Sequence, residues 1–203
     1  MEAAMKSLIG LCFFLLIPFA ACGAGVDKDP GVLVYGGGNG EIPGWAIFTD
    51  LPTGWMSDCC TRAKAIGVNL VLYKGEWTGK PEKVILLNVW TAKAPTLSVD
   101  FQRDRKQYLT SYPTAKEAAF PIANTHKLAC LGSIYQRDDN KDDVVVFCEP
   151  DRASHIRLSW SMLIAGNDPE RQEVLVEFKR VVEQSLYMKY EDGTGKQLSQ
   201  SNK

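Results

Sequence analysis

Residues 130–164 read CLGSIYQRDDNKDDVVVFCEPDRASHIRLSWSMLI, and this stretch decides the fold. A polar turn at 138–142 separates extended chain that ends at Gln136 from the apolar run 143–148. After a second turn, apolar and polar side chains alternate strictly from 152 to 164, which is typical of a strand with one face against a core. Because short turns join consecutive strands that run in opposite directions, we expect three antiparallel strands here.

The two sides of segment 152–164 differ in chemistry. One side is apolar and is predicted to face the core: Ile156, Leu158, Trp160, Met162 and Ile164. The other side is polar, and we predict that it forms a contact surface for a partner: His155, Arg157, Ser159 and Ser161. The alternative is that this polar side is only hydrated.

The first turn also predicts a disulfide. If the turn centres on Asp139, Cys130 and Cys148 lie nine residues before and after the centre and face each other across the hairpin. Directly opposed residues of a non-hydrogen-bonded pair have Cα atoms about 4.5 Å apart, which a disulfide accepts. A turn shifted by one residue would place the two cysteines on opposite faces and exclude the bond. Cys59 and Cys60 then either reach across to this pair or remain thiols.

Further strands and two helices complete the domain on either side of this stretch. Three apolar segments predict strands: 45–48, 68–73 and 84–90. Thr96 or Ser98 is expected to cap a helix that ends before Pro113. A second helix is expected after 166–169, which supplies a turn, an N-cap and a proline at the first helical position, and its apolar stripe ends at Leu186. We therefore predict one α+β domain over residues 44–190, an antiparallel sheet covered by two main helices.

The N-terminal residues predict export. Lys6 precedes an apolar run over residues 8–21, which is short for a bilayer span of about 20 helical residues. Such a run followed by small residues is typical of a secretory signal peptide, here residues 1–23. The alternative is a membrane anchor that is retained. We expect the protein in the periplasm or anchored to a membrane facing it.

Two processing routes fit the end of this signal. The residues before Cys22 resemble a lipoprotein box, so we expect a lipid anchor on Cys22; ordinary cleavage after Gly23 or Ala24 is the alternative. The lead-in at 24–43 contains a glycine cluster and is expected to be flexible, although a short strand fits at 32–35. The last residues, 191–203, are expected to form a polar tail.

Charge and composition disfavour several classes of function. The net charge of −1 argues against nucleic acid as a partner, because such proteins usually carry a basic excess. Two histidines leave little for a zinc site. Asp138, Asn140, Asp142 and Glu149 match a calcium-loop pattern, but Asp143 stands where that loop requires glycine. We expect no metal, no cofactor, and contact with a membrane only through an N-terminal lipid.

The adjacent thiols of Cys59 and Cys60 suggest an enzyme as the first alternative. Residues 57–58 are expected to cap a short helical turn, and a helix N-terminus lowers the pKa of a nearby thiol. Nucleophilic catalysis by Cys60 also needs a base. The sequence offers His126 and His155 for this role without placing either one nearby, so a thiol-dependent or other envelope hydrolase remains an alternative.

A small-ligand carrier is the second alternative. It would need a pocket lined by tryptophans, of which the chain has five: Trp45, Trp55, Trp77, Trp90 and Trp160. Tryptophans in such a sheet more often fill the core, because they bury a large apolar area. We therefore expect core positions for most of them.

Segments 51–58, 67–73 and 75–77, the last leading into 84–90, resemble small exported bacterial proteins. The wider layout over residues 43–190 resembles the PsbP-like family, whose fold is an α/β/α sandwich. Proteins of that family mostly bind other proteins or support an assembly. The resemblance implies a periplasmic module without catalytic activity. We expect it to bind another envelope protein, for example as an immunity protein or an assembly factor.

Overall fold

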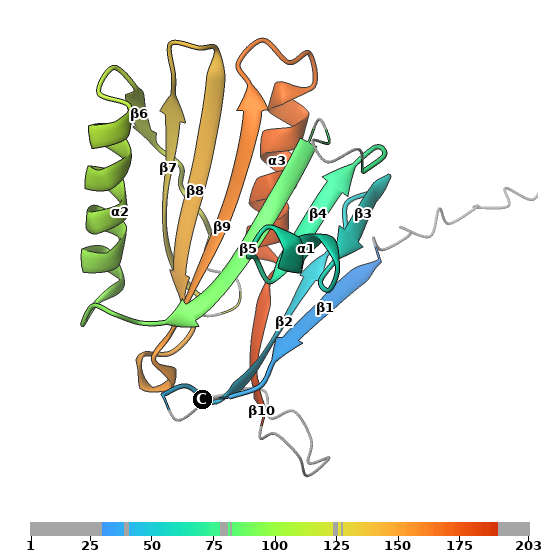
Figure 1. Cartoon of the computed structure of the whole chain (residues 1–203), viewed down its shortest axis with the longest axis vertical. Coiled ribbons are helices and arrows are strands. Elements are labelled where there is room, and N and C mark those ends of the chain that lie inside the picture. Colours follow the sequence, from blue (N-terminus) through green and yellow to red (C-terminus); the bar gives the residue numbers. More distant parts are fainter. Residues whose placement is uncertain are drawn as a thin grey trace, which may run out of the picture.

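The computed structural model describes residues 30–38, 41–77, 81, 83–123, 126 and 128–190. These residues form two antiparallel sheets and three α-helices, which confirms the predicted α+β class (Figure 1). The strands are β1 (Gly31–Gly36), β2 (Gly44–Asp50), β3 (Trp55–Asp58), β4 (Leu70–Lys74), β5 (Lys83–Thr91), β6 (Lys116–Ala119), β7 (Ala129–Gln136), β8 (Lys141–Glu149), β9 (Ile156–Ala165) and β10 (Leu186–Tyr190). The helices are α1 (Arg62–Ala65), α2 (Leu97–Ser111) and α3 (Arg171–Glu183), with a 3-10 turn at Arg152–Ser154.

The larger sheet contains seven strands in the order β3-β4-β5-β9-β8-β7-β6. Strands β7, β8 and β9 follow one another in sequence and pair antiparallel, as the turns between them predict. In the register of β7 and β8, Cys130 faces Cys148 and Ile134 faces Val144, so the turn centres on Asp139. Strand β5 then joins the other edge of β9 and places Asn88 opposite Ser159. The chain therefore builds the middle of this sheet from β5, β9 and β8.

The main core lies between this sheet and α3. The apolar side chains of β9 that the alternation assigns to the core are all buried there, and Leu158 and Trp160 have no exposed surface. Helix α3 covers them with its apolar stripe, in which Phe178 is also fully buried. The smaller sheet, β1-β2-β10, closes the same core beside α3. The Thr49 hydroxyl of β2 donates to the Val181 carbonyl of α3 at 2.7 Å, which ties this sheet to the helix.

The opposite face of the large sheet carries α2 and α1. Thr96 caps α2, because its hydroxyl accepts a hydrogen bond from the Val99 amide at 3.3 Å. Phe101 of α2 packs edge-on against Phe147 of β8 with ring centres 5.9 Å apart. The short α1 buries Ala63 against β4. Helices thus lie on both faces of the sheet, and Figure 1 shows α2 and α1 apart from each other on one face.

Two predictions about the ends of the domain are wrong. The lead-in at 24–43 was expected to be flexible, yet Gly31–Gly36 pairs along its whole length with β2 and buries Val34. Leu186 was expected to end the last helix, but it begins β10. The helix ends at Glu183, because the following residues gain backbone hydrogen bonds with β2 along the length of β10.

Smaller differences concern the start of α3 and the regions beyond the described residues. Helix α3 begins at Arg171, two residues after the proline, and Asp168 accepts a hydrogen bond from the Glu170 amide at 2.7 Å. The predicted signal peptide, the lipid site at Cys22 and the tail at 191–203 lie outside the described residues. Among the described residues, no helix combines the length and apolar character that crossing a membrane requires.

Candidate functional site

The predicted contact surface of His155, Arg157, Ser159 and Ser161 is not one surface, and this prediction is wrong for Arg157. The Arg157 side chain is buried, with 1% of the residue exposed, because the N-terminal turn of α2 covers that end of β9. His155 lies before β9 in a left-handed turn (φ 53°) and is exposed. Only Ser159 and Ser161 line an open cavity.

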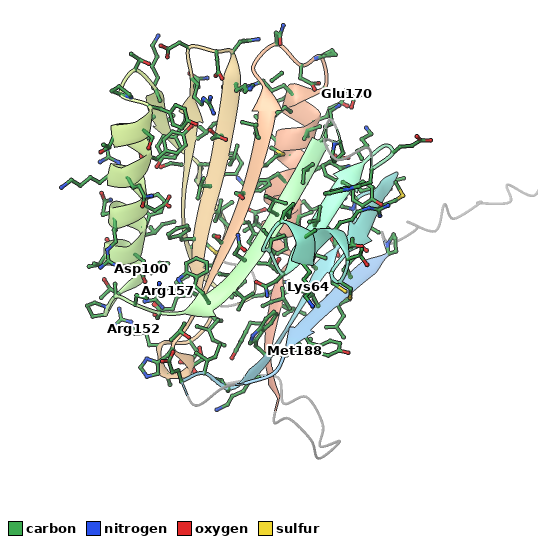
Figure 2. The ribbon with its side chains drawn as sticks, viewed as in Figure 1. Lys64, Asp100, Arg152, Arg157, Glu170 and Met188 are labelled. Atoms are coloured by element: carbon green, nitrogen blue, oxygen red, sulfur yellow. A yellow bond between two sulfur atoms is a disulfide. The ribbon has the colours of Figure 1, made fainter. Side chains whose placement is uncertain are left out.

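Arg157 instead holds α2 to the sheet (Figure 2). Its Nε donates to Asp100 of α2 at 3.0 Å, and its Nη1 donates to Glu149 of β8 at 2.6 Å. Nη2 also lies 3.4 Å from the Ala94 carbonyl. Asp100 and Glu149 are both buried, and Arg157 is the nearest cation to each carboxylate and the only buried one among their arginine partners. The cluster is a structural anchor at one end of the open cavity.

The cavity is a groove of about 700 Å³ between α2 and the segment that follows α1. We call it the α1–α2 groove. Its rims come from α2 and from the loop before β4, and its floor from β5, β8 and β9. It is lined by Gly67, Asn69, Asn88, Val89, Trp90, Asp104, Tyr108, Val145, Phe147, Ser159 and Ser161.

The floor of the groove is polar where a sheet covered by a helix would be apolar. Asn88 and Ser159 face each other across β5 and β9, and Ser161 follows two residues along β9. Within the described part of the chain, the side chains of these three residues have no hydrogen-bond partner. Because buried polar groups are normally paired, these groups require water or an occupant of the groove.

Asp104 gives the groove a negative charge. It lies on α2 one turn after Asp100, and no described residue donates a hydrogen bond or an ion pair to its carboxylate. Burial raises the pKa of Asp104, since the charged form loses hydration without gaining a partner. An ionised Asp104 in the groove therefore favours an occupant that carries a positive charge.

Tyr108 forms the neighbouring part of the α2 rim and is held rigidly. Its ring stacks on Tyr135 with centres 4.1 Å apart, and its hydroxyl donates to the Asp143 carboxylate. Burial and this hydrogen bond raise the pKa of Tyr108, so the phenol stays protonated. Across the floor, Trp90 and Phe147 pack edge-on at 5.4 Å and supply an aromatic wall.

Two features of the sequence indicate part of this groove. Asn88 interrupts the otherwise apolar run of the strand at 84–90, and a polar residue in a buried strand indicates either a partner or a cavity. Asp104 follows Asp100 by four residues, so both lie on the same side of the helix. The distance between α2 and α1 had no sequence signal.

The Cys130–Cys148 disulfide forms as the turn register predicts. The two sulfurs are bonded, and the Cα atoms are 4.2 Å apart. Cys59 and Cys60 are exposed and free, so neither reaches across to this pair. They line a second cavity of about 550 Å³ together with Lys64, between β1 and the loop around α1.

The geometry around Cys59 and Cys60 does not assemble a nucleophile with a base. The Cys60 side chain is the main cause that raises the pKa of the Cys59 thiol, whereas an activated thiol needs a lowered one. Of the described residues that line this cavity, none is a histidine. His126 lies 3.4 Å from the Gln184 amide oxygen, on another part of the chain, and His155 lies in the turn before β9.

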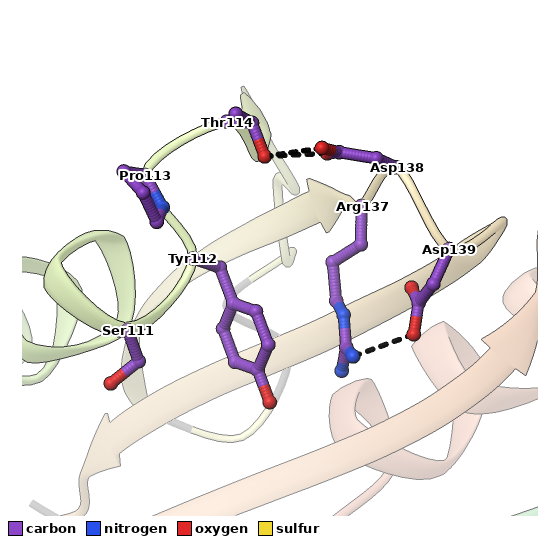
Figure 3. A pocket seen from close by; sticks show the side chains of 7 residues that line it. All are labelled: Ser111, Tyr112, Pro113, Thr114, Arg137, Asp138 and Asp139. Carbon is purple, nitrogen blue, oxygen red and sulfur yellow. Dashed lines mark hydrogen bonds and ion pairs between the residues drawn. The ribbon is translucent and has the colours of Figure 1, made fainter.

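A third cavity, of about 270 Å³, lies where α2 ends beside the β7–β8 turn (Figure 3). The guanidinium of Arg137 stacks over the Tyr112 ring at 4.0 Å and pairs with Asp139 at 2.7 Å. The Thr114 hydroxyl donates to the Asp138 carboxylate at 2.6 Å. These contacts fasten the turn to the helix end and account for the side chains that line the cavity.

The residues of the calcium-loop pattern lie apart in the structure. Asp142 pairs with Arg171 at the start of α3, and Glu149 pairs with Arg157. The Asp142 and Glu149 carboxylates therefore each have a cationic partner within the fold, and the Asp138 carboxylate accepts a hydrogen bond from Thr114.

The tryptophans divide between the core and the surface. Trp45, Trp55 and Trp160 are buried, as expected for core residues. Trp77 and Trp90 are partly buried, and of these two only Trp90 lines the α1–α2 groove. A small-ligand carrier was expected to have a pocket lined by several tryptophans, but Trp90 is the one tryptophan among the described residues that line this groove.

Comparison with known proteins finds similarity of overall arrangement among solved structures. No protein-family model matches the chain, and no curated protein matches it. Among solved structures, the solution structure of cyanobacterial PsbP (CyanoP) from Synechocystis sp. PCC 6803 is similar, with 13% sequence identity and a TM-score of 0.43. The match covers 85% of this chain and 99% of that chain. We therefore base the functional proposal on the side chains of this chain alone.

Proposed function

We propose that the protein is an exported binding module without catalytic activity, and that the α1–α2 groove receives a segment of another envelope protein. The observation that carries the proposal is the unpaired Asp104 carboxylate above a floor of unpaired polar side chains. These groups are open to water in the free domain, and an occupant with matching polar groups can take the place of that water. A binding surface is the ordinary reason for a fold to keep them.

The groove chemistry fits an extended segment with a basic side chain. A lysine or arginine of the partner would pair with Asp104, and its backbone amides and carbonyls would pair with Asn88, Ser159 and Ser161 on the floor. A hydrogen bond to a charged group contributes about 1.5–3 kcal/mol, so this pair would set the affinity and the register of the segment. The aromatic wall of Trp90 supplies apolar contact area beside it.

Export is the part of the proposal that rests on the sequence. The apolar run before Cys22 would act as the export signal, and a lipid on Cys22 would hold the module at a membrane. An immunity protein and an assembly factor are the two concrete forms that we propose for such a module. Both act by occupying a surface on a partner protein.

A second candidate is a carrier of a small polar ligand. The volume of the groove, about 700 Å³, favours such a carrier, because small-molecule sites typically have volumes of about 300–1,000 Å³. A carrier would saturate with a small molecule and leave no protein attached to the groove. The experiment below separates the two candidates.

Site-specific photocrosslinking in intact cells tests the proposal. A photoreactive residue at Leu163, which is 45% exposed on the groove side of β9, should attach a discrete partner protein. The same residue at Val176, which is 59% exposed on α3 at the other face, is the matched control and should not. Equal attachment from both positions, or attachment from neither, would refute a groove-bound protein partner.

Charge variants sharpen the test. Asp104→Asn removes the groove charge and should weaken crosslinking at Leu163. Glu173→Gln removes an exposed charge on α3 and should leave crosslinking unchanged. Loss of crosslinking in both variants would mean that overall charge, and not Asp104, directs the partner.

A further inference from the structure

The two free thiols among the described residues are adjacent in the chain and share one cavity. Cys59 and Cys60 follow β3, and both are exposed in a cavity of about 550 Å³. The same cavity is lined by Lys64 of α1, which Figure 2 shows on the side of the molecule that carries α1, and by apolar side chains of β1 such as Leu33. Two cysteine thiols and one lysine side chain therefore line the same partly apolar cavity.

The turn that carries the thiols is held in place by Asp58. One oxygen of its carboxylate accepts hydrogen bonds from the amides of Cys60 at 3.2 Å, Arg62 at 2.7 Å and Ala63 at 3.0 Å. This carboxylate oxygen therefore ties the backbone of Cys60 to the start of α1 and holds the turn that carries the two cysteines.

Adjacency argues against a direct bond between these two sulfurs. Neighbouring Cα atoms lie about 3.8 Å apart across a trans peptide, and the described residues contain no cis peptide. A disulfide usually needs about 4.4–6.8 Å between Cα atoms, so a Cys59–Cys60 bond would be strained. A metal ion between the sulfurs, with metal–sulfur bonds of about 2.3 Å, lets them stand further apart.

We propose that Cys59 and Cys60 form a two-thiolate site for a soft cation of low coordination number, represented by copper(I). Thiolates are the ligands that select copper(I), whereas structural zinc is held by four ligands. Among the described residues, no group of three or more histidine, cysteine, aspartate or glutamate side chains converges on a metal position. Two thiolate sulfurs are enough to coordinate copper(I), whereas they are too few for a structural zinc site.

The binding step balances without a redox partner. Each thiol releases one proton to solvent, the copper stays in its +1 state, and the product is a bis-thiolate complex with one net negative charge. Lys64 in the same cavity offsets that charge. The thiol cavity adjoins the α1–α2 groove and shares Gly67 and Asn69 with it, but neither cysteine nor Lys64 lines the groove, so this inference goes beyond the proposed binding function and does not depend on it.

Competition for copper(I) tests the site. The protein, with Cys130–Cys148 kept oxidised, is titrated without oxygen against a chromophoric copper(I) chelator. We expect one equivalent bound, and Cys59→Ser or Cys60→Ser should each weaken binding by at least about 100-fold, since outer-shell changes alone cost about 10–100-fold. Unchanged affinity in both serine variants would show an adventitious site and overturn the proposal.

Further measurements keep the test specific. Lys64→Met should weaken binding by about 10-fold, while Lys64→Arg and the exposed α2 control Lys106→Met should not. X-ray absorption at the copper edge should show two sulfur neighbours in a monomer. Three or more sulfur neighbours, a copper-bridged dimer, or zinc bound as tightly as copper(I) would each overturn a two-thiolate site within one chain.

Discussion

Replacing Arg157 with methionine should destabilise the fold more than any surface charge change. The guanidinium lies between Asp100 and Glu149, with donor–acceptor distances of 3.0 and 2.6 Å. Both acidic residues are 8% exposed, so Arg157→Met leaves two poorly hydrated carboxylates with only the largely exposed Arg103 and Arg152 as cationic neighbours, at 4.0 and 3.6 Å. Methionine keeps most of the apolar volume of arginine. The loss of stability therefore measures the effect of removing the positive charge.

The expected cost is about 3–5 kcal/mol, the usual penalty for removing one partner of a buried ion pair. In a domain of this size, 1 kcal/mol lowers the midpoint of thermal unfolding by about 2–4 °C, so the midpoint should fall by about 6–20 °C. Urea unfolding followed by tryptophan fluorescence gives the free energy, and thermal unfolding followed by circular dichroism gives the midpoint.

Arg152→Met is the matched control. Its Nε lies 3.6 Å from the same Glu149, but 76% of its side chain is exposed, so water replaces the lost contact. Its cost should stay below about 1 kcal/mol. The cost of Arg157→Met should also shrink in a background with Asp100→Asn and Glu149→Gln, where no charge is left unpaired. Equal costs for the two arginines, or no change in that background, would refute the reasoning.

Glu170→Gln should make stability less sensitive to acid. Lys83 is the main partner that lowers the pKa of Glu170 from 4.5 to about 2. The ionised Glu170 therefore stabilises the fold fully above pH 4.5, and this contribution is lost as the pH falls toward 2. The urea midpoints of wild type and variant should converge at that pH. Replacing Cys130 and Cys148 with alanine should lower the free energy of unfolding by about 3 kcal/mol, because the bond closes a loop with a sequence separation of 18; an unchanged midpoint would contradict this. Asp104→Asn should stabilise the protein at pH 7 and not at pH 3, since burial raises the pKa of Asp104 and its ionisation opposes folding; equal gains at both pH values would contradict this.

The pairing of β7, β8 and β9 could be predicted because its determinants are local. A polar turn centred on Asp139 sets which residues face each other, and that register places Cys130 opposite Cys148. The alternation in β9 assigns Leu158 and Trp160 to one face, and the structure buries both. These features depend on a period of two residues and on one turn.

The predictions that were wrong concern which segment covers each face of a strand. Alternation correctly separates Arg157 from Leu158, but it does not reveal that the first turn of α2 lies over Arg157. Leu186 continues the apolar spacing of α3, yet pairing with β2 turns it into a strand. Each outcome is decided by a segment distant in the sequence, whose position no local period reports.

The sequence by itself determined the pairing of β7, β8 and β9, the helix that begins near Thr96 and the disulfide register, because each of these follows from the spacing of nearby residues. Only the tertiary structure decided where the open surface lies. The α1–α2 groove combines Asn88, Asp104 and Ser159 from three elements, and it stays open because α2 and α1 cover separate parts of one sheet face. Distances between elements arise from packing, and packing is a property of the whole chain.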